Sequence, residues 1–148
     1  MNITMAREEM FQVLQDAWDA TQWPADMFAS KPVLLYQGRD KVAPPAPDTP
    51  YTHIYRRSAY GEQAAFGDGR KTPYQDRGTL WILCFGPQSS GKGLEIAEFQ
   101  GMIAKNAYRR PNEGECVWYR NARIVDAGLR DGLEQINVLV DYEYHETR

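Results

Sequence analysis

The sequence is poor in the side chains that build metal centres and disulfide frameworks, with two cysteines and two histidines among 148 residues. Cys84 and Cys116 both lie in predicted strands, which favours buried free thiols of a protein made in a reducing cytoplasm over a disulfide. Neither His53 nor His145 has a cysteine or a second histidine at the spacing of a structural zinc site. We therefore expect no metal ion and no cofactor.

An excess of charge of one sign and a long apolar run are also missing. The formal net charge is −3 and the sequence pI is near 5.4, so overall charge does not direct the chain to nucleic acid or to an anionic membrane. No run approaches the roughly 20 apolar residues that span a bilayer, and the N-terminus lacks the apolar core of a signal peptide. We expect one domain, residues 1–148, with a sizeable core and no membrane contact.

Arrangements of catalytic side chains are likewise missing. Ser89 and Ser90 lack the G-x-S-x-G elbow and a base to activate them. Asp141 and Glu143 share one face of the last predicted strand, where a hydrated polar edge explains two carboxylates better than paired acid–base catalysis. His145 lies in a tail that we expect to fray. The inventory therefore predicts a protein that is not an enzyme.

What the sequence does have is a strongly apolar strand over residues 78–85, placed before a glycine-rich bend and an amphipathic helix. Successive side chains of a strand point to opposite faces, and both sets are apolar here. One set is Trp81, Leu83 and Phe85, and the other is Leu80, Ile82 and Cys84. We expect a central strand covered on both faces. Apolar residues three and four apart predict the helix over 94–108.

The bend itself, residues 86–92, matches G-x-x-x-x-G-K, the loop with which nucleoside triphosphatases bind phosphate. Gly93 stands where a serine or threonine hydroxyl would hold magnesium, and Pro87 removes one of the backbone N–H groups that the loop offers to phosphate. We interpret the bend as a structural turn. A small nucleotide-binding enzyme that uses residues 86–92, with Lys92 on phosphate, is the alternative from a different functional class.

The remaining pattern predicts a second helix and several strands. Apolar residues three and four apart predict a helix over 5–20, and alternation predicts the strands. The strands cover residues 33–36, 51–60, 116–119, 122–127 and 135–144, with a polar turn at 128–132. Together the elements predict an α+β fold: a single, mainly antiparallel sheet with an N-terminal helix and one long central helix packed on it.

Residues 61–77 form a long stretch without a predicted element, and we expect a flexible loop between two strands. Basic and aromatic side chains alternate in and before it, as they do at many protein and single-stranded nucleic-acid contacts. Protein contact, nucleic-acid contact and a solvated hairpin tip remain open. The candidate interaction residues are Arg56, Arg57, Tyr60, Phe66, Arg70, Lys71, Tyr74 and Arg77.

Several segments, taken in order, resemble the tail terminator proteins of long-tailed bacteriophages, the lambda-type minor tail family. They are residues 50–55 (PYTHIY), which enter a strand before a glycine-rich loop, and 77–82 (RGTLWI), which return as a strand. Residues 86–93 then open the helix, and 135–144 (QINVLVDYEY) are similar to the family's final strand. The likeness extends over most of the chain, although 61–77 has no residue-by-residue match.

The resemblance implies a structural protein of the virion that caps the tail tube at its head-proximal end after assembly in the host's bacterial cytoplasm. It implies a homohexameric ring that stops tube growth, contacts the major tail tube protein and the head completion or connector protein, and lets DNA pass through its lumen. The candidate interaction residues would then lie at subunit or tube contacts. A head–tail connector or completion protein is the alternative within the same class.

Overall fold

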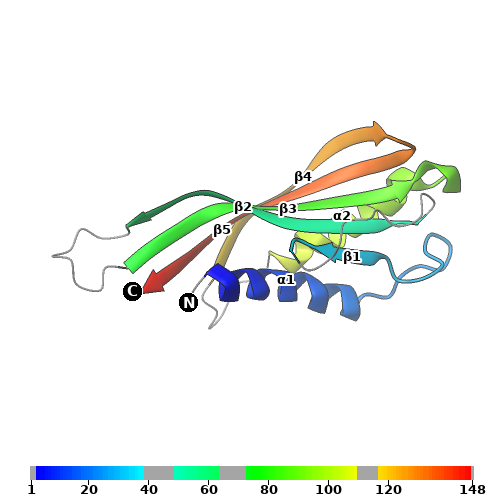
Figure 1. The fold of residues 1–148 in the computed structure, drawn as a ribbon. Coiled ribbons are helices and arrows are strands. Elements are labelled where there is room, and N and C mark those ends of the chain that lie inside the picture. Colours follow the sequence, from blue (N-terminus) through cyan, green and yellow to red (C-terminus); the bar gives the residue numbers. More distant parts are fainter. Residues whose placement is uncertain (1–2, 39–48, 64–72, 110–116, 148) are drawn as a thin grey trace.

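The computed structural model describes residues 3–38, 49–63, 73–109 and 117–147. Two helices and five strands are present in these ranges (Figure 1). In chain order the elements are α1 (Ile3–Ala20), β1 (Val33–Tyr36), β2 (Tyr51–Gln63), β3 (Pro73–Pro87), the 3₁₀ turn η1 (Gln88–Ser90), α2 (Gly93–Ala107), β4 (Val117–Arg130) and β5 (Leu133–Thr147).

The five strands form one sheet in the order β1-β2-β3-β5-β4. β3 is the central strand, as its two apolar side-chain sets predict. β1 pairs with β2 in parallel, and the other three pairings are antiparallel. The α+β prediction of a mainly antiparallel sheet with an N-terminal and a central helix is therefore confirmed.

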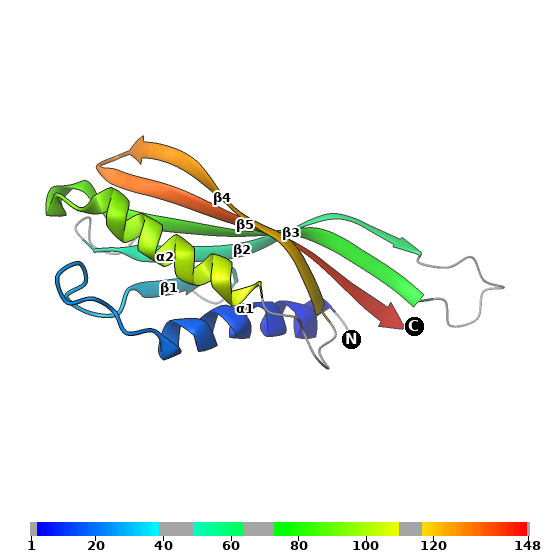
Figure 2. The same ribbon diagram turned by 180° about the vertical axis from the view of Figure 1, so that it is seen from behind.

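Both helices lie on the same side of the sheet (Figures 1 and 2). We call this side the covered face. Most of its strand side chains are buried and apolar, and Thr52 and Asp76 are buried polar exceptions. The buried apolar set is Ile54, Leu80, Ile82, Cys84, Ile136, Val138, Val140, Tyr142 and Tyr144. α1 adds Met10, Phe11, Leu14 and Trp18 to this core, which is the stripe that its helical spacing predicts. Each large apolar side chain that is fully buried there contributes about 1.5–3 kcal/mol before entropy is subtracted.

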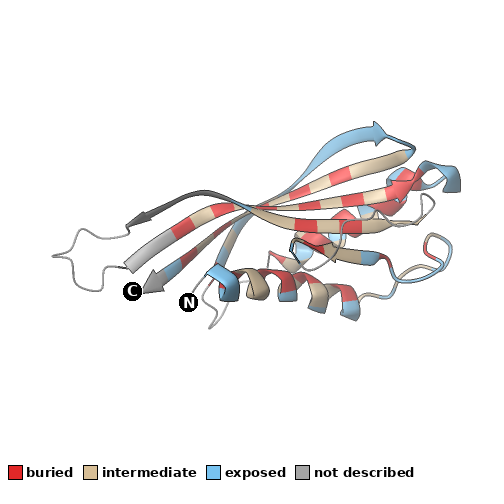
Figure 3. Ribbon diagram, viewed as in Figure 1, coloured by how far each residue is buried: buried red, intermediate tan, exposed pale blue. Residues whose placement is uncertain are grey.

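The opposite face of the sheet carries no helix among the described residues, so the prediction that β3 is covered on both faces is wrong. Trp81, Leu83 and Phe85 are only partly buried, and the alternation of buried and partly buried residues runs along β2, β3 and β5 (Figure 3). An apolar strand face carries the same pattern whether a helix of its own chain or another molecule covers it, so periodicity alone could not separate the two cases.

The predicted loop at 61–77 is shorter than expected at both ends. β2 continues to Gln63 and β3 begins at Pro73, so that Tyr60 pairs with Arg77 and Gln63 with Tyr74. Ladder hydrogen bonds between two strands satisfy the backbone whatever the side chains are, so a hairpin can extend through residues without a strand-like pattern. Residues 64–72 of the predicted loop lie outside the described residues.

β4 and β5 form one long hairpin instead of three short strands and a five-residue turn. Asn121, at a φ of 55°, sits at an irregularity in the pairing that lets β4 continue past it. The turn consists of Asp131 and Gly132, with φ values of 53° and 76°. Two central residues with positive φ are typical of a type I′ turn, for which Asp-Gly is a preferred sequence. The signal for the tighter turn was therefore present in the sequence.

A hydrogen-bonded polar side chain, Gln100, lies fully buried where α2 meets the sheet. Its amide Nε2 donates to the Phe85 carbonyl at 2.9 Å, and its Oε1 accepts from the Thr52 hydroxyl at 2.7 Å. Buried polar groups are tolerated when their hydrogen bonds are made. These bonds fix α2 over β2 and β3 in one position, which apolar packing alone specifies less sharply.

Cys84 is a fully buried free thiol on the covered face of β3, whereas Cys116 lies outside the described residues. Burial raises the pKa of the Cys84 thiol to about 12, although a hydrogen bond with Thr52 acts in the opposite direction. The neutral thiol is the form that the core accommodates, so an ionised thiolate favours unfolding.

We expect the free energy of unfolding to fall in alkaline solution because of this thiol. Its contribution is fully present below the unfolded pKa of 9.0 and is lost as pH rises toward about 12. At pH 10.5 the loss from Cys84 alone is roughly 2 kcal/mol relative to pH 8. Burial also raises the pKa of Tyr108 and of Tyr144, which adds a further loss above pH 10.

Urea unfolding at a series of pH values measures this loss, and Cys84→Ala is the matched control. The variant should keep the tyrosine contribution and lose the thiol contribution, so its stability should fall less steeply between pH 8 and 10.5. Equal slopes for the two proteins would contradict a buried neutral thiol.

Candidate interaction surface

The face of the sheet opposite the helices, which we call the open face, is apolar at its centre. Each residue is placed there by the period of two along its strand and by its register with the neighbouring strands. The apolar side chains of the open face are Val33, Leu35, Tyr51, Tyr55, Trp81, Leu83, Phe85, Trp118, Val125, Leu133 and Leu139. They come from all five strands, so the apolar surface runs across the full width of the sheet.

Aromatic pairs across β2 and β3 explain why the centre of the open face is partly buried although no helix in the described part of the chain covers it. Tyr51 stacks on Phe85 with ring centroids 4.5 Å apart, and Tyr55 stacks on Trp81 at 6.2 Å with the rings nearly parallel. Both pairs are direct cross-strand neighbours, and His53 packs against Tyr55 from the same strand. Partial burial raises the pKa of Tyr51. Each ring thus shields the next one while its outer surface stays open to solvent.

Charged side chains border the apolar centre on β3, β4 and β5. Glu143 accepts from Arg120 at 2.5 Å, lies 3.4 Å from Arg77 Nε and lies 3.1 Å from His145 Nε2. Only 17% of its side chain is exposed.

The prediction that Asp141 and Glu143 form a hydrated strand edge is wrong, because β5 lies between β3 and β4. The expected fraying at His145 is also wrong, since that residue pairs with Gln75 in the sheet.

Asp141 and Arg57 complete this border. Asp141 lies 3.3 Å from Arg123 on the neighbouring strand, and Arg57 is exposed opposite Thr79. The border therefore holds four arginines, Arg57, Arg77, Arg120 and Arg123, against two carboxylates. With His145 neutral, the balance is two positive charges, which gives this part of the open face a basic character.

The predicted interaction residues are divided between the two faces. Arg57 and Arg77 lie on the open face. Arg56 lies on the covered face, where its Nη1 donates to the Tyr142 hydroxyl at 3.3 Å and its backbone N–H donates to Gln37 Oε1 at 3.0 Å. Tyr60 lies in β2, where it pairs with Arg77, and Tyr74 lies in β3, where it pairs with Gln63. The other three, Phe66, Arg70 and Lys71, lie outside the described residues.

Sequence reasoning missed the aromatic centre of the open face. Tyr51, Tyr55 and Trp81 stand in strands that were predicted, but the apolar neighbours of Trp81 led us to expect that this chain covers both faces of β3. The mixed alternation of residues 51–60 was the available signal, because it indicated that one side of that strand is only partly buried.

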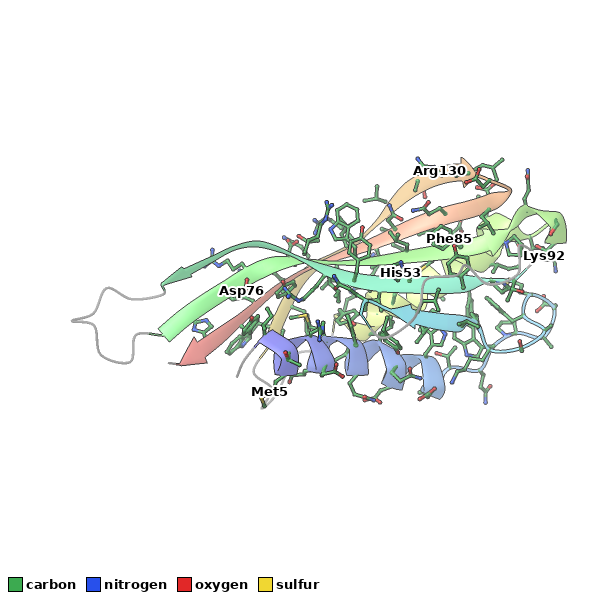
Figure 4. All side chains as sticks on the ribbon, in the orientation of Figure 1. Met5, His53, Asp76, Phe85, Lys92 and Arg130 are labelled. Carbon is green, nitrogen blue, oxygen red and sulfur yellow. The ribbon has the colours of Figure 1, made fainter. Side chains whose placement is uncertain are left out.

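The glycine-rich bend after β3 uses its backbone N–H groups inside the protein. Gln88 donates to the Gly132 carbonyl at 2.9 Å, and Gly91 donates to the Gln88 carbonyl at 3.0 Å. The Lys92 N–H donates to the Ser90 hydroxyl at 3.1 Å, while its ammonium lies 3.7 Å from Asp26. Phe85 and Lys92 mark the two ends of the bend in Figure 4. N–H groups that are bonded within the loop do not converge on a phosphate, which supports a structural turn.

Within the described ranges, no group of three or more histidine, cysteine, aspartate or glutamate side chains is placed to hold a metal ion. No helix within the same ranges is long and apolar enough to cross a membrane. The aromatic rings and arginines of the open face have a composition that suits contact with protein.

The sequence matches no protein-family model and no curated protein. Eleven chains of solved structures match the fold. One of these, a protein whose name describes no activity, superimposes with a TM-score of 0.54 at 20% sequence identity, over 90% of this chain and 94% of that chain. At that identity the likeness supports the fold alone, and it shows that nearly the whole chain takes part in it.

Proposed function

We propose that this protein is a structural component of a phage tail that caps the tail tube as a hexameric ring, ends tube elongation and forms the interface to the head connector. The observation that carries the proposal is the one-sided sheet. One face is sealed by both helices, while the other presents stacked aromatic rings and a border of arginines. Aromatic residues and arginine are enriched where proteins contact one another.

Two features of the described residues support an assembly role over catalysis. Two side chains that could perform chemistry are engaged in the fold: Cys84 is sealed in the core, and Glu143 is held by two arginines. The phosphate-loop pattern at 86–92 forms a turn in which the N–H groups of Gln88, Gly91 and Lys92 are bonded within the protein. The partners expected for the ring are the tail tube protein and the connector protein, with DNA passing through the lumen.

Light scattering over a concentration series tests the proposal. We expect a hexamer, or an equilibrium between monomer and hexamer that purified tail tubes shift toward the ring by mass action. Replacing residues 64–72 with an equally long glycine–serine segment should preserve the far-ultraviolet circular dichroism spectrum and abolish tube capping, as judged by tube length in electron micrographs.

Tube length in the micrographs tests the capping, and the oligomeric state from light scattering tests the ring. A wild-type protein that stays monomeric at all concentrations, with tubes present and with tubes absent, would rule out the ring. A calorimetric titration with ATP addresses the enzyme alternative, because saturable binding that disappears in Lys92→Ala would favour a nucleotide site.

A further inference from the structure

We propose that the open face is covered in the assembled ring by the helix layer of a second copy of this chain, that is, by the outer side of α1 and α2. The inference rests on the proposed ring and assigns its subunit contact to two named surfaces. The sheet of one subunit would pack on the helices of the next, so that layers of sheet and helix alternate around the ring.

The first argument is the size and shape of the apolar surface. Five strands at about 4.8 Å spacing, over about six residues of about 3.4 Å each, give a flat footprint on the order of 500 Å². A stable interface buries about 800 Å² of accessible surface per partner. The accessible area of the open face is larger than its flat footprint, because the side chains project from the sheet. Two helices packed 8–10 Å apart span roughly 20 Å with their side chains, which is close to the width of this sheet.

The second argument is that the helix layer also exposes apolar side chains. On α1, Met5 is 56% exposed, and Figure 4 places it on the helix layer, whereas His53 lies in the sheet. On α2, Leu94 is 47% exposed and Met102 is 46% exposed. Methionine adapts its shape to irregular aromatic surfaces and makes favourable sulfur–aromatic contacts. The outer side of the helices therefore offers a suitable partner for the rings of the open face.

The third argument is charge. The sequence of α1 holds one arginine against four carboxylates and that of α2 holds one lysine against two carboxylates, which gives the helix layer a net charge of −4. Among them, Asp16 and Glu98 are exposed. The border of the open face has an excess of two positive charges, from the four arginines and two carboxylates described above. Opposite charges on facing surfaces favour association and fix its register.

The two surfaces are different parts of the molecule, so the contact is heterologous. A heterologous contact repeats from one copy to the next and closes into a ring when the rotation between copies divides a full turn. A two-fold dimer would instead place the same surface against itself, which would bring the four border arginines of two copies together. Charge therefore favours the repeating arrangement.

A charge-reversal experiment tests this contact. Arg57→Glu with Arg123→Glu changes the open face, and Asp16→Lys with Glu98→Lys changes the helix layer. The open-face pair should raise the concentration at half-assembly at least about tenfold, because it changes the border from an excess of two positive to an excess of two negative charges, facing a helix layer of net charge −4. The helix-layer pair neutralises that layer, which removes the attraction across the contact and should raise the same concentration by a smaller factor. Combining the four substitutions in one chain places the negative border against a neutral helix layer, so the repulsion of the open-face pair disappears and assembly should recover most of what that pair lost. Asp126→Lys is the control and should assemble as wild type does, because Asp126 is exposed on β4 and its pairing with Ile136 places it on the face opposite the border.

The outcomes separate this inference from the ring itself. If wild type forms a hexamer and both double variants assemble equally well, the contact proposed here is wrong and the ring stands. If the open-face pair assembles normally but no longer binds tail tubes, the open face meets the tube protein and not a second copy. Failure of the four-substitution chain to recover, with its circular dichroism spectrum intact, would also overturn the contact. A wild-type protein that never forms a ring would refute both proposals.

Discussion

Gly86→Ala is expected to lower the free energy of unfolding by at least about 3 kcal/mol, and to leave much of the protein unfolded at 37 °C. A Cβ atom at Gly86 would lie 1.9 Å from the Gly93 carbonyl oxygen and 2.8 Å from its carbon. Both neighbours are backbone atoms at the start of α2, so no side chain can rotate away to make room. Urea unfolding followed by circular dichroism measures the loss.

Gly91→Ala is the matched control, because it changes the same bend by the same methyl group. Gly91 has a φ of 75° and nothing within 4 Å of its missing Cβ. Its substitution should therefore cost only the strain of a left-handed residue, about 1–2 kcal/mol. Equal losses at Gly86 and Gly91 would mean that backbone conformation governs both positions, and would contradict the close approach of β3 and α2.

The elements that the sequence predicted well are those in which local pattern and tertiary packing agree. α1 carries its buried residues at helical spacing, and the two apolar sets of residues 78–85 predicted the central place of β3. On the inner side of α1 and on the covered face of β3, each patterned apolar side chain has a neighbour to bury it, so a one-dimensional pattern contains the needed information.

The interaction surface was harder to predict because it depends on which element covers a face of the sheet. The sequence of a single strand does not contain that information. Trp81, Leu83 and Phe85 are as apolar as their buried neighbours, yet no helix of this chain lies over them in the described ranges. Gln100 is a polar side chain that is fully buried, whereas the three residues of β3 are apolar side chains that are only partly buried. Its hydroxyl partner Thr52 is 48 positions away, so a polar residue on the buried side of α2 had no visible reason in the sequence.

One of the two hairpins could have been predicted at its full length from the sequence, and the other could not. The Asp131-Gly132 pair is a local signal for a two-residue turn, and a stricter reading of turn chemistry would have found it. The extension of β2 and β3 through residues 61–63 and 73–77 has no such signal. It depends on backbone pairing between two segments and on β5, which pairs with the same part of β3.

Trp18→Ala is expected to lower the free energy of unfolding by about 3–5 kcal/mol, the usual cost of removing a large aromatic side chain from a core. Trp18 is fully buried near the C-terminal end of α1. Its ring packs against Trp23 at a centroid distance of 4.7 Å, and its indole N–H donates to the Pro32 carbonyl at 2.9 Å. The side chain thus joins α1 to the segment that leads into β1. Guanidinium unfolding followed at 222 nm measures the loss.

Trp18→Phe separates the two contributions of this side chain. The smaller ring keeps much of the packing and removes the indole N–H, so the Pro32 carbonyl loses its buried donor. An unsatisfied buried acceptor costs about 1–3 kcal/mol, which predicts an intermediate stability for this variant. Because β1 pairs with β2 beside the apolar centre of the open face, loosening of this segment should also weaken ring assembly. A Trp18→Ala protein that unfolds at the wild-type denaturant concentration would show that α1 is not anchored through this residue.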